Sequence, residues 1–183
     1  RFPSAKGALL IDMNGREVQL WAGLGGFPNK ILPGGYVMGT TGTRPGKKAY
    51  QDQIDLVQVD WDGNIVWKFD KTELIADGDK DPVYMARQHH DSSEKDLRRI
   101  LLSGGEPKTD SGNTLILTHE NLYNHDISDK RLIDDKIIEV DWEGNILWSW
   151  RASDHLSSLD STRQQKTHCS VIHACRAKAG GDW

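Results

Sequence analysis

The sequence predicts an all-β fold, a partial β-propeller of antiparallel strands joined by long loops. Two observations predict it. A stretch that reads as strand, turn and strand occurs twice in nearly the same letters, as DLVQVDWDGNIVWKF (55–69) and KIIEVDWEGNILWSW (136–150). A short apolar strand behind a Gly-rich turn precedes each copy, as LPGGYVMGT (32–40) and DSGNTLILT (110–118). Repeated β units with Trp and Asp-Gly turns are typical of propellers, whose blades commonly have four strands.

Each copy of the longer stretch predicts a hairpin. In the first copy Val57, Val59 and Trp61 alternate with polar residues, which is the period of a half-buried strand. DGN and EGN supply the residue with positive φ that a tight turn needs. A fainter copy, GALLIDMNGREVQLW (7–21), keeps the Asp and Gly of the turn in similar places. We therefore expect a leading hairpin followed by two recognisable blades.

The number of blades is too small for a closed ring. We expect one domain, 1–183, of about two to three blades, whereas propellers commonly close with about 4–8. An open ring exposes strand edges, which natural β proteins avoid. We therefore expect a second polypeptide, or a segment missing after Trp183, to complete the ring in a hetero-oligomer or a longer chain. The alternative is a small β-sandwich.

Composition excludes two classes of protein. The net charge is -4 and the Lys and Arg residues are scattered, so the basic stripe of a nucleic-acid-binding protein is absent. No apolar run approaches the ~18–20 residues of a membrane span. Cys169 and Cys175 are either a small disulfide loop in an oxidising compartment or two free thiols.

Three passages, in chain order, resemble the N-terminal part of the arylsulfotransferase-like (aryl-sulfate sulfotransferase) propellers, which are relatives of quinoprotein-like propellers. They are HHD (89–91) followed by GNTLIL (112–117), the VDWEGNILWSW hairpin, and GGDW (180–183). The resemblance implies a transferase that moves a sulfuryl group from an aryl sulfate, a small-molecule substrate, through a channel histidine. It also favours a periplasmic or secreted protein. In the family a His-x-Asn element follows a Trp like Trp183, so we expect the sulfuryl-accepting histidine outside these residues.

The adjacent histidines His89 and His90 are the first candidate site residues. MARQHHD stands where the inner strand of the second blade should begin, and inner strands line the central channel of a propeller. We expect one of these histidines there as a catalytic residue, in a binding or acid/base role. Because adjacent side chains on a strand point to opposite faces, only one can face the channel, and we favour His90. In the alternative interpretation Asp91 caps a turn and both histidines bond to the backbone.

His119 is the third candidate catalytic residue, because it follows an apolar strand where side chains reach the propeller face. We expect Asp91, Glu120 and His155 to bind substrate. No cofactor is expected, but a metal bound through His90 and His119, with a carboxylate as third ligand, is the alternative. That metal would make the protein a metal-dependent hydrolase or lyase. A propeller without catalysis would instead be a binding module.

Other polar clusters predict structure rather than chemistry. SDH (153–155) predicts a helix N-cap as well as an Asp-His pair. HCSVIHAC (168–175) matches no standard zinc spacing. DGDKDP (77–82) resembles a calcium loop but has Pro82 at the sixth place, where Gly is needed. We expect an acidic solvated loop there.

Overall fold

The computed structural model describes residues 7–43, 52–75, 81–94, 112–125, 129 and 132–155. The side chains of 26–28 and 90–94 are not among the described parts. Strands and two short 3₁₀ helices make up the elements of these ranges, and none of the helices there is long and apolar enough to cross a membrane. Predictions for Cys169, Cys175 and Trp183 fall outside the described residues.

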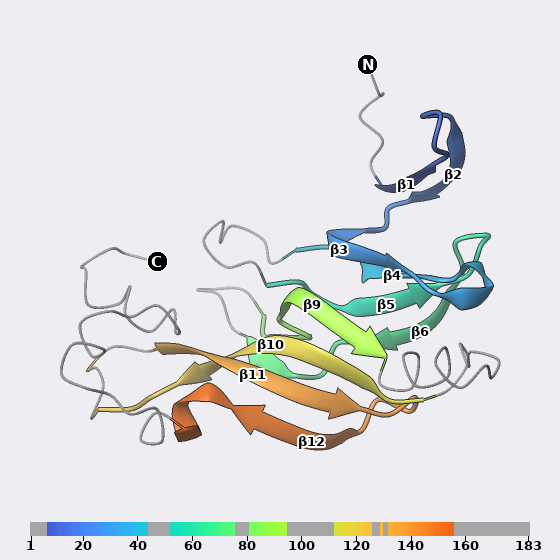
Figure 1. Cartoon of the computed structure of the whole chain (residues 1–183). Helices are drawn as coiled ribbons and strands as arrows, with labels where there is room; N and C mark the ends of the chain where they lie inside the picture. Colours follow the sequence, from blue (N-terminus) through green and yellow to red (C-terminus); the bar gives the residue numbers. More distant parts are fainter. Residues whose placement is uncertain are drawn as a thin grey trace.

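Two four-stranded antiparallel sheets form the body of the structure, as the repeats predict (Figure 1). The first has the order β3 (Gly25–Ile31), β4 (Val37–Thr40), β5 (Leu56–Val59) and β6 (Ile65–Phe69). The second has the order β9 (Gln88–Glu94), β10 (Thr114–Leu122), β11 (Leu132–Val140) and β12 (Ile146–Arg151). The edge strands β3 and β9 contact each other, as expected for the inner strands of neighbouring blades.

Smaller elements precede, separate and follow the two sheets. They are the hairpins β1 (Gly7–Ile11) with β2 (Glu17–Ala22) and β7 (Glu73–Ile75) with β8 (Val83–Met85), and the 3₁₀ helices η1 (Pro33–Gly35) and η2 (Ala152–His155). The two strong copies of the repeat therefore lie in successive four-stranded sheets. Within the described residues, only a two-stranded hairpin stands between these sheets.

The turns of the repeat are built by an aspartate that binds its own turn. Asp60 accepts the backbone N–H of Asn64 at 2.8 Å and its side-chain N–H at 2.9 Å. Asp141 and Asn145 repeat both bonds, at 2.7 and 2.9 Å. The Gly of each turn has the positive φ that the sequence predicts, 88° at Gly63 and 85° at Gly144. The predicted hairpins are confirmed.

A shared hydrophobic core joins the two sheets. Trp67, 6% exposed, packs in this core and donates its indole N–H to the carbonyl oxygen of Trp142 at 2.9 Å, and the two rings stack. The buried members of the core are Leu32, Met38, Leu56, Trp67, Phe69, Ala86, Ile116, Ile138 and Val140. The leading hairpin packs on the opposite face of the first sheet through a second core, Trp21, Leu24, Val37, Val57 and Val59. Hairpin and sheets therefore stack as successive layers (Figure 1).

The two copies of the repeat carry equivalent tryptophan residues whose burial differs. Trp148 occupies in the second sheet the place that Trp67 occupies in the first. Trp67 is buried under the next sheet, whereas Trp148 is 49% exposed. Ile146, two residues before Trp148 and therefore on the same face of the strand, is 44% exposed. In the described part of the chain this face of the second sheet has no following layer.

Candidate functional site

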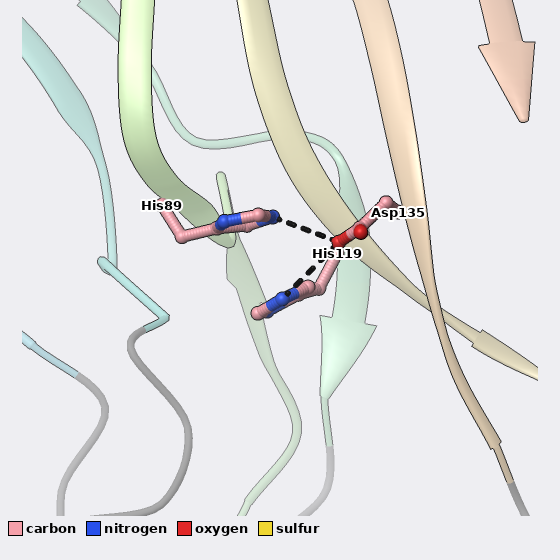
Figure 2. Close-up of side chains that lie close together, drawn as sticks. All are labelled: His89, His119 and Asp135. Carbon is pink, nitrogen blue, oxygen red and sulfur yellow. Dashed lines mark ion pairs between the residues drawn. The ribbon is translucent and has the colours of Figure 1, made fainter. Parts of the chain in front are cut away.

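Two imidazoles and one carboxylate meet on three neighbouring strands, β9, β10 and β11 (Figure 2). His119 of β10 pairs directly across the ladder with Asp135 of β11, and His89 comes from the adjacent β9. The Oδ1 atom of Asp135 lies 3.3 Å from His89 Nε2 and 3.6 Å from His119 Nε2. One nitrogen or oxygen from each of these three residues lies within 4.8 Å of the others.

The two histidine rings are stacked and buried. Their centroids are 3.7 Å apart and their planes differ by 18°. His89 is 4% exposed and His119 is 3% exposed. Their Nε2 edges both turn toward the Asp135 carboxylate (Figure 2). The Nε2 atoms of both histidines therefore face the same carboxylate, that of Asp135.

Asp52 orients the ring of His119 from its other edge. The Nδ1 atom of His119 lies 2.5 Å from Asp52 Oδ1. An ionised carboxylate can only accept a hydrogen bond, so Nδ1 carries the proton and donates it. In a neutral His119 ring the lone pair of Nε2 then faces Asp135, whose Oδ1 atom is 3.6 Å away. The arrangement is the carboxylate–imidazole pair that holds a histidine for proton transfer at its far nitrogen.

Arg87 completes a buried chain of charges behind the site. Its Nε donates to Asp52 Oδ2 at 2.8 Å, and its Nη1 donates to Glu73 Oε2. Glu73 also accepts the backbone N–H of Asn121 at 3.1 Å. Both Arg87 and Asp52 are fully buried, at 0% exposure. Burying these two charges costs free energy unless they remain paired. The ion pairs of Arg87 therefore hold Asp52 in one position.

The backbone at Arg87 also joins the strands that carry the site. Arg87 has φ = 53°, in the left-handed region that a non-glycine residue rarely adopts. Its N–H donates to the carbonyl of Gln53, and its own carbonyl accepts the N–H of His119, each at 3.0 Å. These bonds place Asp52, next to Gln53, within reach of His119. They also fix the start of the strand that carries His89.

Burial and neighbouring charges move two pKa values at the site. Burial lowers the pKa of His119 below its ordinary value of 6.5, and electrostatic interactions with His89 and Arg87 lower it further, against the opposing hydrogen bond and charge of Asp52. Burial by itself would raise the pKa of Asp52. The hydrogen bond from His119 and the charge of Arg87 outweigh that effect, so the pKa of Asp52 lies below its ordinary 3.8.

The structure places the residues predicted from the sequence in different surroundings. It brings His89 and His119 together. Glu120 lies instead in ion pairs with Lys136 at 2.9 Å and Arg151 at 2.7 Å. His155, on η2, stacks on the Trp150 ring at 5.0 Å and is exposed.

His90 and Asp91 belong to β9, but their side chains are not described. The preference for His90 over His89, and the substrate-binding role of Asp91, therefore stay predictions.

Four charged residues at the site were not predicted from the sequence. They are Asp52, Glu73, Arg87 and Asp135. Arg87 had a local signal, because it lies two residues before His89 in MARQHHD. The other three contact the site only through pairings between distant segments, and no spacing in the sequence marks those pairings.

Comparisons with known proteins give one match. A family model described as Arylsulfotransferase (ASST) matches residues 85–183, which is more than half of the chain. The matched part contains His89, His119 and Asp135, whereas Asp52 precedes it. No curated protein and no solved structure matches the chain.

Proposed function

Since the chain belongs to the arylsulfotransferase (ASST) family, we propose that it takes part in sulfuryl transfer from an aryl sulfate to a phenolic acceptor. His119, assisted by His89, serves as its acid/base group. The observation that carries this proposal is the hydrogen bond of His119 Nδ1 to the buried Asp52, which leaves Nε2 as the proton-transfer atom. The nucleophile is a separate channel histidine, as the family resemblance implies.

The proposed reaction has two steps, and the same proton serves both. In the first, a nitrogen of the nucleophilic histidine attacks sulfur, and the bond from sulfur to the aryl oxygen breaks. The departing phenolate takes a proton from Nε2 of protonated His119. In the second, the acceptor oxygen attacks sulfur, the sulfur–nitrogen bond breaks, and the acceptor's proton goes to His119 Nε2. His119 thus returns to its starting state.

Charge at the site supports this assignment. Protonated His119, the starting state of the first step, lies between Asp52 and Asp135. Both carboxylates favour its positive charge, against the burial that lowers its pKa. His89 stacks on His119, and its Nε2 edge lies beside the same Asp135 oxygen. A protonated His89 would therefore add a donor for the sulfuryl oxygens. The alternative of a metal-dependent hydrolase or lyase requires a metal at these residues.

Turnover of 4-nitrophenyl sulfate with a phenol as acceptor tests the proposal, because the released 4-nitrophenolate absorbs light. We expect the protein, purified together with the segment or polypeptide that carries the sulfuryl-accepting histidine, to transfer the sulfuryl group. In that preparation His119→Gln should lower kcat by about 10²–10⁴-fold, the usual contribution of acid/base catalysis. The matched control is His125→Gln, because the His125 side chain is 77% exposed. This control should keep the wild-type rate.

Two results would contradict the proposal. One is a purified protein that neither binds nor turns over any aryl sulfate. The other is a His89→Gln, His119→Gln double variant that transfers the group at the wild-type rate, because the paired imidazoles would then lie outside the reaction.

A further inference from the structure

We propose that His89, His119 and Asp135 form a binding site for a divalent first-row transition metal, with Zn²⁺ as the probe. The ligand atoms are Nε2 of each histidine and Oδ1 of Asp135. Imidazole nitrogens and a carboxylate oxygen are ordinary zinc ligands, and three protein ligands with one open position are typical of catalytic zinc sites. Metal binding at these residues is expected whether or not the protein carries out the proposed sulfuryl transfer.

The spacing of the ligand atoms fits a tetrahedral ion. Two atoms bound to one tetrahedral zinc, each at ~2.0–2.1 Å, stand roughly 3.4 Å apart. The Asp135 oxygen lies 3.3 Å from His89 Nε2 and 3.6 Å from His119 Nε2. Each ring nitrogen therefore stands at the distance from the Asp135 oxygen that two ligands of one tetrahedral ion have, and the ligand atoms of all three residues lie within 4.8 Å of one another.

The surrounding residues prepare His119 as a ligand. Asp52 accepts the Nδ1 proton at 2.5 Å and thereby directs the Nε2 lone pair toward Asp135. A carboxylate behind a metal-binding histidine sets the tautomer and raises the basicity of the ring. The pairing of Arg87 with Asp52 holds that carboxylate in place.

The stacking of the rings limits the affinity. Their planes differ by only 18°, so the lone pairs of the two Nε2 atoms run nearly parallel. A metal bound to both rings requires them to tilt toward one another. The stacking contact between the two rings is then lost, and the cost of that movement makes the free energy of metal binding less favourable.

Metal and proton compete for the same atom, which links this site to the proposed function. A zinc ion on His119 Nε2 occupies the position from which the proton is transferred. We therefore expect Zn²⁺ to inhibit sulfuryl transfer. This last expectation rests on the proposed function, whereas the binding itself does not.

Titration of the metal-free protein with Zn²⁺ in a calorimeter tests the binding. The Cys169→Ser, Cys175→Ser variant serves as the background, because thiolates also bind zinc. We expect one zinc per chain at the site, and at least a tenfold loss of affinity in His89→Gln and in Asp135→Asn. His125→Gln, an exposed histidine near Asp129, is the matched control and should bind as the background does.

Circular dichroism and thermal melting show whether each variant folds, and zinc should raise the melting midpoint of the background protein but not of Asp135→Asn. Background protein that binds no zinc, or Asp135→Asn that binds it equally well, overturns the inference. Zinc binding without any sulfuryl transfer leaves the inference intact and removes the proposed function. Sulfuryl transfer by a protein that binds no zinc and is not inhibited by it overturns the inference and leaves the proposed function intact.

Discussion

Replacement of Asp52 by Asn tests the charge chain behind the site. The Asp52 carboxylate is fully buried and accepts Arg87 Nε at 2.8 Å and His119 Nδ1 at 2.5 Å. Asparagine keeps one accepting oxygen and turns an amide N–H toward the other donor. One charge-assisted bond is lost, and the buried Arg87 loses one of its two carboxylate partners.

The expected loss of stability follows from these contacts. Removing one partner of a buried ion pair costs about 3–5 kcal/mol. Glu73 remains paired with Arg87, so we expect the lower end, about 3 kcal/mol. Urea unfolding followed by tryptophan fluorescence measures it. Asp62→Asn makes the same chemical change at an exposed turn position and should alter the free energy of unfolding by less than about 0.5 kcal/mol.

The same variant has a second readout that a purely structural role would not produce. An amide N–H beside Nδ1 favours the His119 tautomer with its proton on Nε2, which cannot act as the base. We therefore expect kcat for 4-nitrophenyl sulfate to fall by about 10²-fold or more, with a small change in KM. A loss of stability below about 1 kcal/mol together with an unchanged kcat would refute the reasoning, because Arg87 and His119 would then not depend on this carboxylate.

Three further predictions concern the repeat. Trp67→Ala should cost about 3–5 kcal/mol, as buried aromatic truncations do, whereas the repeat-equivalent Trp148→Ala, at a half-exposed position, should cost less than half as much in urea unfolding. A larger cost at Trp148 would mean that another layer covers it in solution. Gly63→Ala should cost about 1–2 kcal/mol, because φ is 88° and an added Cβ meets no atom within 4 Å, so that only the backbone is strained. Hydrogen bonds from Asn145 lower the pKa of Asp141 below 3.8. The folded state therefore binds that proton less readily, and stability is lost as the pH falls below 3.8. Asp141→Asn should flatten this acid dependence in urea titrations between pH 5 and pH 2, and an unchanged slope would contradict it.

The hairpins could be predicted from the sequence because their determinants are local. Asp60 and Asn64 lie within one turn of chain, and both hydrogen bonds between them can form before the sheet does. The period-2 pattern of the strands then decides which side chains are buried. The same reasoning held for the second copy at Asp141. The two four-stranded sheets could therefore be predicted without knowledge of distant contacts.

The charged partners of the site could not be predicted in this way. Asp52 and His119 are distant in sequence and meet only because the segment before β5 pairs with the backbone around Arg87. Asp135 lies opposite His119 because of the register of a long hairpin, and the sequence between its two strands has no Asn-Gly or Asp-Gly pair from which that register could be predicted. Glu120 was the carboxylate adjacent in sequence, whereas Asp135 is the carboxylate adjacent in the ladder.

The difference between the two sheets explains why the site lies in the second one. Val37 pairs with Val59 in the first ladder, and Thr114 pairs with Val140 in the second. The same number of residues further along, the first ladder has Gly42 opposite Ile54, whose backbones are joined by a hydrogen bond of 3.0 Å. The second ladder has His119 opposite Asp135 at that level.

The repeat thus supplies equivalent backbone positions, and only one copy fills them with groups that can carry charge. The first sheet contributes differently, because Asp52 lies just before its strand β5 and reaches across to His119. A residue of one layer therefore orients the proton-transfer group of the next. A variant that weakens the packing between the layers, such as Trp67→Ala, should then disturb His119 even though Trp67 makes no contact with it among the described interactions.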